Sequence, residues 1–152
     1  SRMGFTSEHV ELIRLAASLN DIGKVALPDE LVAKPGPLTA DERRALERHP
    51  QIGYRIFESL GADPVATWVL HHHERWDGAG YPARLAGEHI PLGSRILFVA
   101  DAYEAMTTDQ AWRPRLPREA ALAELRRCAG TQFDPSVVDA FLAELEGSAV
   151  AA

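Results

Sequence analysis

Residues 71–82 spell "HHHERWDGAGYP", and this short run carries more chemistry than any other part of the chain. Three consecutive histidines and a glutamate come first, and a polar segment with glycines at positions 78 and 80 follows. Histidine is a common metal ligand and glycine permits tight turns, so the run predicts a metal site beside a functional loop. Successive helical residues lie about 100° apart, so the three histidines cannot all face one cavity. We expect His71 to point away from the site.

The composition limits the kind of protein that this chain can be. Its 152 residues suit one domain that buries a sizeable core without disulfides or a structural metal, so a metal site would be functional rather than structural. The single cysteine, Cys128, excludes an internal disulfide and a cysteine-rich zinc site, and it fits the reducing cytoplasm. A net charge of -6 argues against a duplex nucleic-acid partner. No apolar run approaches the roughly 20 residues of a membrane span, so we expect no membrane segment.

Apolar residues recur with the helical period along most of the chain, and no strand-like alternation is found. We therefore predict an all-α bundle of about seven helices. Ser7 and Asp63 are expected caps, and Thr39 with Glu42 has capping-box spacing. The first helix is apolar around much of its circumference, which predicts a central, buried position. The expected helices lie at residues 7–19, 40–49, 51–61, 63–74, 93–107, 117–130 and 134–146, with one extra turn near 28–34.

Four of these helices carry residues that can bind a metal, either at the end of the helix or within its apolar run. Asp21 follows the first helix, His49 ends the second, and Asp101 interrupts the most apolar one. Carboxylates and imidazoles that converge inside a helical bundle form a common type of metal site, and a buried carboxylate needs a partner. Simpler alternatives exist: His49 could complement a helix dipole, and Asp101 could pair with Arg95 or Lys24. The ligand candidates are Asp21, His49, His72, His73 and Asp101.

The motifs taken together resemble the HD-GYP domain, a branch of the HD phosphohydrolase superfamily. The resemblance rests on "HHHERWDGAGYP" with "SLNDIGK" (18–24), "HPQIG" (49–53) and "DAYEAMT" (101–107), and it extends over nearly the whole chain. It implies an all-helical bundle around a two- or three-metal centre, commonly iron or manganese. It also implies hydrolysis of cyclic di-GMP and an upstream sensory or receiver domain. We expect a domain at residues 1–146 that lacks the first family helix, and a tail at 147–152.

The resemblance also implies roles for single residues. Asp21 is the bridging carboxylate, which holds one metal position together with three imidazoles, and Asp101 belongs to the other position. Lys24 resembles the lysine beside the phosphate, so Lys24 and Asp21 are the catalytic candidates. Two metal ions bridged by a carboxylate can neutralise a phosphodiester and supply hydroxide near neutral pH. The candidates for contacts with the ligand are Tyr81, Asp77 and Arg113.

Two positions depart from the family pattern. Asn20 stands where the family has the histidine of the His-Asp pair, and an amide oxygen is a weaker donor for these metals. Gln110 replaces an arginine expected at the phosphates. The leading hypothesis is a degenerate domain that binds one metal ion or none and hydrolyses cyclic di-GMP weakly or not at all. An active phosphodiesterase is one alternative. The other is a module that senses a nucleotide or docks a signalling protein through the loop after the histidines.

Overall fold

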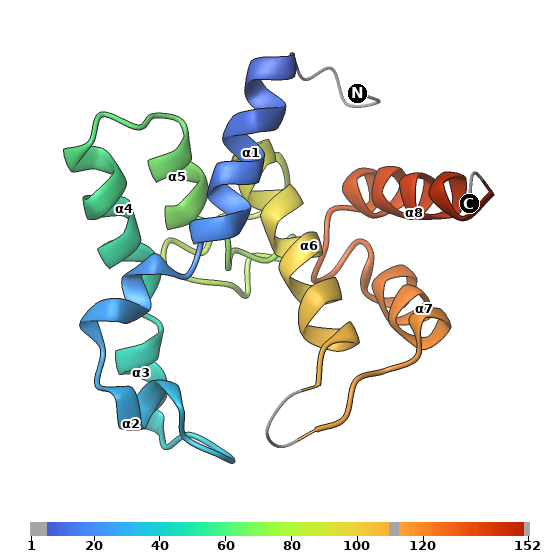
Figure 1. Cartoon of the computed structure of the whole chain (residues 1–152). Coiled ribbons are helices and arrows are strands. Elements are labelled where there is room, and N and C mark those ends of the chain that lie inside the picture. The colour runs from blue at the N-terminus through green and yellow to red at the C-terminus, as the bar shows by residue number, and fades with distance from the viewer. Residues whose placement is uncertain (1–5, 110–112, 151–152) are drawn as a thin grey trace.

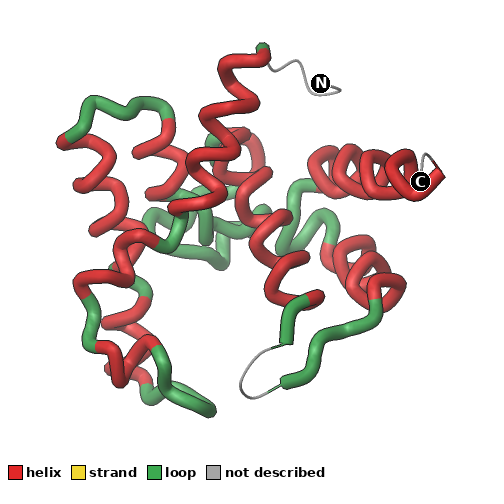
Figure 2. Tube along the Cα trace, in the orientation of Figure 1, coloured by secondary structure: helices red, strands yellow, loops and turns green. Residues whose placement is uncertain are grey.

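The computed structural model of the chain describes residues 6–109 and 113–150. These residues form eight α-helices and two short 3-10 helices joined by loops, with no strand among them (Figure 1, Figure 2). Because α2 is a single turn, the prediction of an all-α bundle with seven longer helices is confirmed. The elements are α1 (Ser7–Leu19), η1 (Ile22–Ala26), α2 (Asp29–Val32), α3 (Ala40–Leu46), α4 (His49–Ser59), α5 (Val65–Leu70), η2 (Gly87–His89), α6 (Leu92–Thr107), α7 (Arg118–Cys128) and α8 (Pro135–Val150).

Helix α6 lies at the centre of the molecule, between two hydrophobic cores. Its Leu97 packs with buried residues of α1, α4 and α5, and its Val99 packs with buried residues of α7 and α8. Figure 1 shows α6 between these two groups of helices. The start of α6 lies directly on α5, because a Cβ at Gly93 would come within 2.3 Å of the Trp68 ring. The helix that carries Asp101 therefore has a fixed position relative to the other helices.

Helix α1 is not the central helix, which corrects the prediction from its apolar circumference. Only Ala16 is buried in it, while Leu15 is 43% exposed and Leu19 is 36% exposed. A helix is buried only where other elements cover it, and among the described elements α5 and α6 make the main contacts with α1. The cap is also one residue earlier than predicted, since the Thr6 hydroxyl accepts a hydrogen bond from the backbone N–H of His9.

The helix predicted at residues 40–49 is shorter, and His49 begins a new helix instead of ending this one. The capping box of Thr39 and Glu42 starts α3 as expected, but α3 stops at Leu46. Pro50 then lies in the first turn of α4, where its missing N–H costs nothing. His49 is therefore at a helix start, although its Nδ1 also contacts the carbonyl of Leu46, the last residue of α3, at 2.8 Å.

Three other boundaries differ from the sequence prediction. Pro64, and not Asp63, precedes α5, and no side chain caps this helix. Helix α5 ends at Leu70, so the three histidines form the turn that follows it. Helix α8 extends to Val150 and thus includes the first residues of the segment predicted as a tail. None of the described helices has the length and apolar character needed to cross a membrane.

Residues 24–48, which we call the arm, contain no buried residue. The arm includes α2 and α3, which project away from α6 in Figure 1. An ion pair of 2.7 Å between Lys34 Nζ and Glu42 Oε2 joins the segment after α2 to α3. Asp21 lies just before the arm and His49 directly after it, so both ends of the arm adjoin predicted ligands.

Candidate metal centre

Four of the five predicted ligands form one cluster. Asp21, His49, His72 and His73 each offer a ligand atom, and these atoms all lie within 4.8 Å of one another. They come from the junction of α1 and η1, from the first residue of α4, and from the turn after α5. His71 lies outside the cluster, as predicted, with its Nδ1 3.6 Å from a carboxylate oxygen of Glu74.

A close contact between glycine and helix α4 brings Asp21 to His49. A Cβ at Gly23 would lie 2.0 Å from the carbonyl oxygen of His49 and 2.8 Å from the nitrogen of Gly53, so only glycine fits there. This contact presses η1 against the first turn of α4. As a result, His49 Nε2 lies 3.2 Å from Asp21 Oδ1.

Backbone carbonyls orient two of the imidazole rings. His49 Nδ1 donates to the Leu46 carbonyl at 2.8 Å, and His72 Nδ1 donates to the Val69 carbonyl at 2.6 Å. A carbonyl can only accept, so the proton belongs on Nδ1 and each Nε2 turns toward the cluster. The Nε2 atom of His49 is 3.4 Å from that of His72 and 3.2 Å from that of His73. Nitrogen acceptors that converge in this way need a cation or a proton between them.

The electrostatic surroundings keep these ligands in the forms that bind metals. Burial lowers the pKa of His72 to about 4 and also lowers the pKa of His73 far below its ordinary value, so both rings are neutral at pH 7. Burial alone would raise the pKa of Asp21, but the contacts with His49 and the hydrogen bond from Lys24 outweigh it and hold that pKa well below its usual range. One carboxylate and three imidazoles are a donor set suited to a divalent transition metal.

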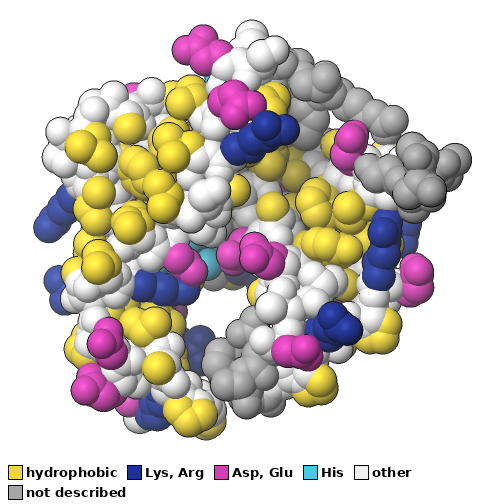
Figure 3. Space-filling view, viewed as in Figure 1, with side chains coloured by type: hydrophobic (Ala, Val, Ile, Leu, Met, Phe, Trp, Pro, Cys, Tyr) yellow, Lys and Arg dark blue, Asp and Glu magenta, His cyan; other side chains and the backbone are white. Residues whose placement is uncertain are grey.

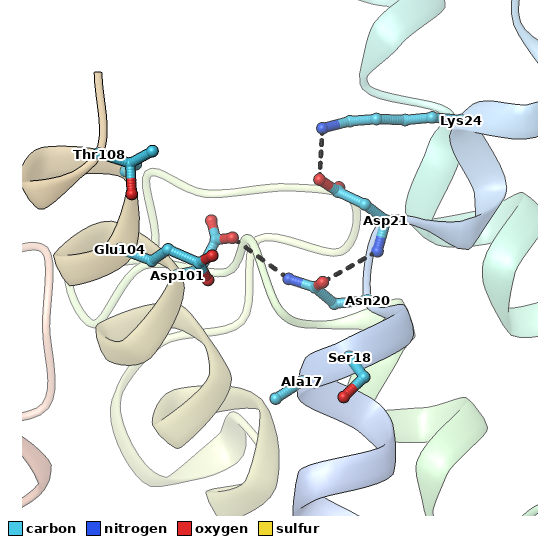
Figure 4. A pocket seen from close by; sticks show the side chains of 9 residues that line it. Ala17, Ser18, Asn20, Asp21, Lys24, Asp101, Glu104 and Thr108 are labelled. Atoms are coloured by element: carbon cyan, nitrogen blue, oxygen red, sulfur yellow. Dashed lines mark hydrogen bonds and ion pairs between the residues drawn. The ribbon is translucent and has the colours of Figure 1, made fainter. Parts of the chain in front are cut away.

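A polar cleft adjoins the cluster, between the end of α1 and α6. Its volume is about 730 Å³, and Figure 3 shows this face hollowed near its centre, with acidic side chains around a histidine. On the side of the cleft next to the arm, Lys24 Nζ donates a hydrogen bond of 2.6 Å to Asp21 Oδ2. The lining residues are Ala17, Ser18, Asn20, Asp21, Lys24, Asp101, Glu104, Ala105 and Thr108 (Figure 4).

Asn20 connects the two sides of this cleft. Its Oδ1 accepts a hydrogen bond from the backbone N–H of Asp21 at 3.0 Å, and its Nδ2 donates to Asp101 Oδ1 at 3.3 Å (Figure 4). Asp101 is thus the predicted ligand that lies outside the four-residue cluster. Burial and the charge of Asp21 raise the pKa of Asp101, and the Asn20 hydrogen bond only partly opposes this.

Asp101 pairs with neither Arg95 nor Lys24, so the prediction that one of these residues balances its buried charge is wrong. Arg95 donates to Asp134 at 2.6 Å and lies over the Trp76 ring, while Lys24 pairs with Asp21. The sequence motifs contain no signal for the Asn20 contact, because it joins residues 81 positions apart.

The candidates for ligand contact lie at different distances from the cluster. The Tyr81 ring is 5.0 Å from the His73 ring, measured between centroids. Arg113 donates to the carbonyl of Ala105, a residue that lines the cleft. Asp77 is exposed and pairs with Arg75 at 2.7 Å, so its contacts are made within the loop. Gln110 lies outside the described residues.

Comparison with known proteins identifies the family. The family described as "HD domain" matches residues 1–137, so the chain belongs to the HD domain family. The chain is 43% identical over 144 residues to the cyclic di-GMP phosphodiesterase response regulator RpfG of Xanthomonas campestris, covering 93% of this chain and 38% of that protein. It is 40% identical over 144 residues to a cyclic di-GMP phosphodiesterase of Thermotoga maritima, covering 92% and 39%.

A third relative and a solved structure agree with this assignment. The 3'3'-cGAMP-specific phosphodiesterase 2 of Vibrio cholerae is 34% identical over 146 residues, covering 91% of this chain and 27% of that protein. A crystal structure of a cyclic GMP-AMP specific phosphodiesterase from V. cholerae matches with a TM-score of 0.74 at 20% identity, over 95% of this chain and 40% of that one. This likeness concerns the fold. The chain thus spans less than half the length of each of these proteins.

Proposed function

We propose that this chain is an HD-GYP-type domain that holds a single divalent transition metal, iron or manganese, at Asp21, His49, His72 and His73. Its ligand is cyclic di-GMP or a related cyclic dinucleotide, which it hydrolyses slowly or not at all. The four-residue cluster supports the metal, and the names of the relatives support the ligand class. A net charge of -6 supports a small nucleotide rather than a nucleic-acid duplex.

The observation that carries the proposal is the double hydrogen bond of Asn20. Its amide is engaged by Asp101 on one side and by the backbone of Asp21 on the other. Asp101 therefore has an N–H donor where a second metal would need an imidazole ligand. Changes outside the ligand shell typically cost about 10 to 100-fold in metal affinity or activity, so the loss of a ligand should cost at least that much.

The residues in and around the cleft have distinct tasks under this proposal. A bound ion would supply positive charge for the phosphate oxygens and acidify a water molecule. Lys24 projects from η1 at the cleft wall and can donate to a non-bridging phosphate oxygen. Tyr81 stacks beside His73 and offers a ring for a base, and Arg113 lies near the rim for a phosphate. Asp77 is a weaker candidate because Arg75 already pairs with it.

An active phosphodiesterase is the second candidate. It is favoured by the complete four-residue cluster next to Lys24 and by relatives named as cyclic di-GMP phosphodiesterases. Turnover of cyclic di-GMP near about 1 per second, an ordinary enzyme rate, would support it over the degenerate domain. A sensing or docking module is the third candidate, favoured by the large polar cleft, and it requires nucleotide binding without turnover.

Restoring the missing imidazole tests the proposal. A cavity of about 30 Å³ beside Asn20, lined also by Ala17, Leu97 and Asp101, leaves room for a larger side chain. We expect Asn20→His to bind a second ion and to hydrolyse cyclic di-GMP at least about 10-fold faster than the unchanged protein. The matched control, Asn20→Ala, removes the amide without adding a ligand and should gain neither. Equal metal content and rates in all three proteins would refute the role of Asn20.

The lengths and names of the relatives also support a proposal about partner domains. Because they are more than twice as long and one is named a response regulator, we propose that this domain works with a sensory or receiver domain. The exposed loop after the histidines remains a candidate surface for a protein partner.

A further inference from the structure

Glu74 is a buried carboxylate that the proposed function does not use. Its side chain has no exposed surface, although it lies directly after the histidine turn. Oε1 accepts a hydrogen bond from the backbone N–H of Ala83 at 2.6 Å, and Oε2 accepts one from Leu85 at 3.1 Å. A buried carboxylate is costly unless its oxygens are paired, and here both oxygens hold the same stretch of loop.

The loop held by Glu74 is the one that carries Tyr81. Tyr81 lies two residues before Ala83, and its own N–H donates to the carbonyl of His73 at 3.3 Å. Gly80 lies against the same turn, because a Cβ there would be 2.4 Å from the nitrogen of Arg75 and 2.5 Å from the oxygen of His73. Two independent features, the Glu74 carboxylate and the bare backbone of Gly80, thus attach this loop to the ligand-bearing turn.

We propose that Glu74 is a positioning residue, which fixes the Tyr81 loop on the histidine turn and so places the Tyr81 ring in the nucleotide site. The inference rests on the proposed function, because it assigns Glu74 a task in ligand binding. It does not assign Glu74 to the metal. The rings of His49 and His72 are oriented by the carbonyls of Leu46 and Val69, and neither contact involves Glu74.

The chemistry of Glu74 makes the inference specific. Glutamine has nearly the same shape, but its NH₂ group would face one of the two backbone N–H donors, leaving that donor without an acceptor. Glu74→Gln should therefore release one end of the loop while His49 and His72, which are held by the Leu46 and Val69 carbonyls, stay in place. Gly80→Ala should displace the loop at its other contact without altering any charge.

The experiment follows Tyr81 and the ligand separately. The chain has three tyrosines, so fluorotyrosine labelling gives three ¹⁹F NMR signals, and Tyr81→Phe identifies the one from Tyr81. Calorimetry with Mn²⁺ and then with cyclic di-GMP measures the two affinities. The matched controls are Glu119→Gln on α7 and Gly147→Ala on α8, where a Cβ meets nothing within 4 Å.

We expect Glu74→Gln and Gly80→Ala to shift the Tyr81 signal and weaken cyclic di-GMP binding about tenfold or more, with Mn²⁺ content unchanged. A lowered melting temperature with an unmoved Tyr81 signal and unchanged nucleotide affinity would show a purely structural role and overturn the inference. If Glu74→Gln does not fold, Gly80→Ala decides between these results. If the unchanged protein binds no cyclic dinucleotide, the proposed function fails, and the Tyr81 signal alone tests the positioning.

Discussion

The side-chain amide of Asn20 lies between the metal cluster and Asp101, which is on the other side of the cleft. The four residues of the cluster lie within 4.8 Å of one another, whereas Asp101 faces them through the Asn20 hydrogen bond. An amide can both donate and accept, so it satisfies a carboxylate and a backbone N–H without any ion. A histidine at position 20 would instead offer a lone pair to a cation. We therefore propose that the side chain at position 20 decides whether Asp101 can take part in binding a second ion.

The cluster itself can be tested by removing one imidazole. We expect His72→Ala to weaken Mn²⁺ binding by at least about 100-fold, because it removes a ligand rather than one of its supports. His72 is fully buried, so circular dichroism should first establish that the variant folds. The control is His89→Ala, an exposed histidine outside the cluster, which should bind Mn²⁺ normally. Similar affinity in both variants, measured against a competing chelator, would remove His72 from the metal site.

The residues of the site could be predicted better than their contacts. Asp21, His49, His72 and His73 lie together in the structure as expected, because their ligand chemistry and the motifs around them single them out in the sequence. The link between Asn20 and Asp101 depends on how α1 lies against α6, which no local pattern specifies. The burial of Glu74 could not be predicted either, because its hydrogen-bond partners are backbone N–H groups, and no sequence pattern marks them.

Helix α3 belongs to the arm, which buries less surface than the helices around the metal cluster. No residue from 24 to 48 is buried, whereas α5 has four buried residues. Elements that bury little surface open locally at low cost in free energy. The capping box of Thr39 and Glu42 and the Lys34 ion pair are therefore important for the stability of α3.

Removal of the cap tests this local stability. Thr39→Ala should cost about 1 kcal/mol of α3 stability, because it deletes the hydrogen bond from the Glu42 N–H. Amide hydrogen exchange should become faster in α3 and stay the same in α6, and the melting temperature should barely move. If exchange in α3 and α6 accelerates together, the arm unfolds with the whole domain and this description of it is wrong.

The Arg95–Asp134 ion pair joins α6 to the start of α8. The bond is 2.6 Å long, and the Asp134 side chain is 2% exposed. Burial alone would raise the pKa of Asp134, but hydrogen bonds from Ser136 and Arg95 outweigh it and keep that pKa below 3.8. The folded state thus favours the charged carboxylate.

Asp134→Asn should therefore destabilise the protein by roughly 3 kcal/mol at pH 7, as expected when one partner of a buried pair is neutralised. Because the pKa is lower in the folded state, this stabilisation is present above pH 3.8 and is lost as the pH falls further. Denaturant unfolding of both proteins at pH 7 and pH 3 measures this change. A difference in stability that is as large at pH 3 as at pH 7 would contradict the role of the charge.

At the scale of the whole molecule, α6 connects two cores, and the metal cluster adjoins both, because the His73 ring lies 6.2 Å from the ring of Phe98, which packs against the second core. Leu97 belongs to the core that supports the histidine turn, and Val99 belongs to the core formed with α7 and α8. The helical class followed from the period of apolar residues, but the central position of α6 did not. Helix α1 was also expected to be central, yet it lies at the surface, because burial depends on which elements cover a helix.

We propose that this domain holds at most one divalent ion and not two. Elemental analysis of the purified protein, after incubation with excess Mn²⁺ or Fe²⁺ and removal of the free metal, tests it most directly. The Asn20 hydrogen bond to Asp101 predicts one ion or fewer per chain in the unchanged protein. Two fully occupied ions per chain would contradict this account.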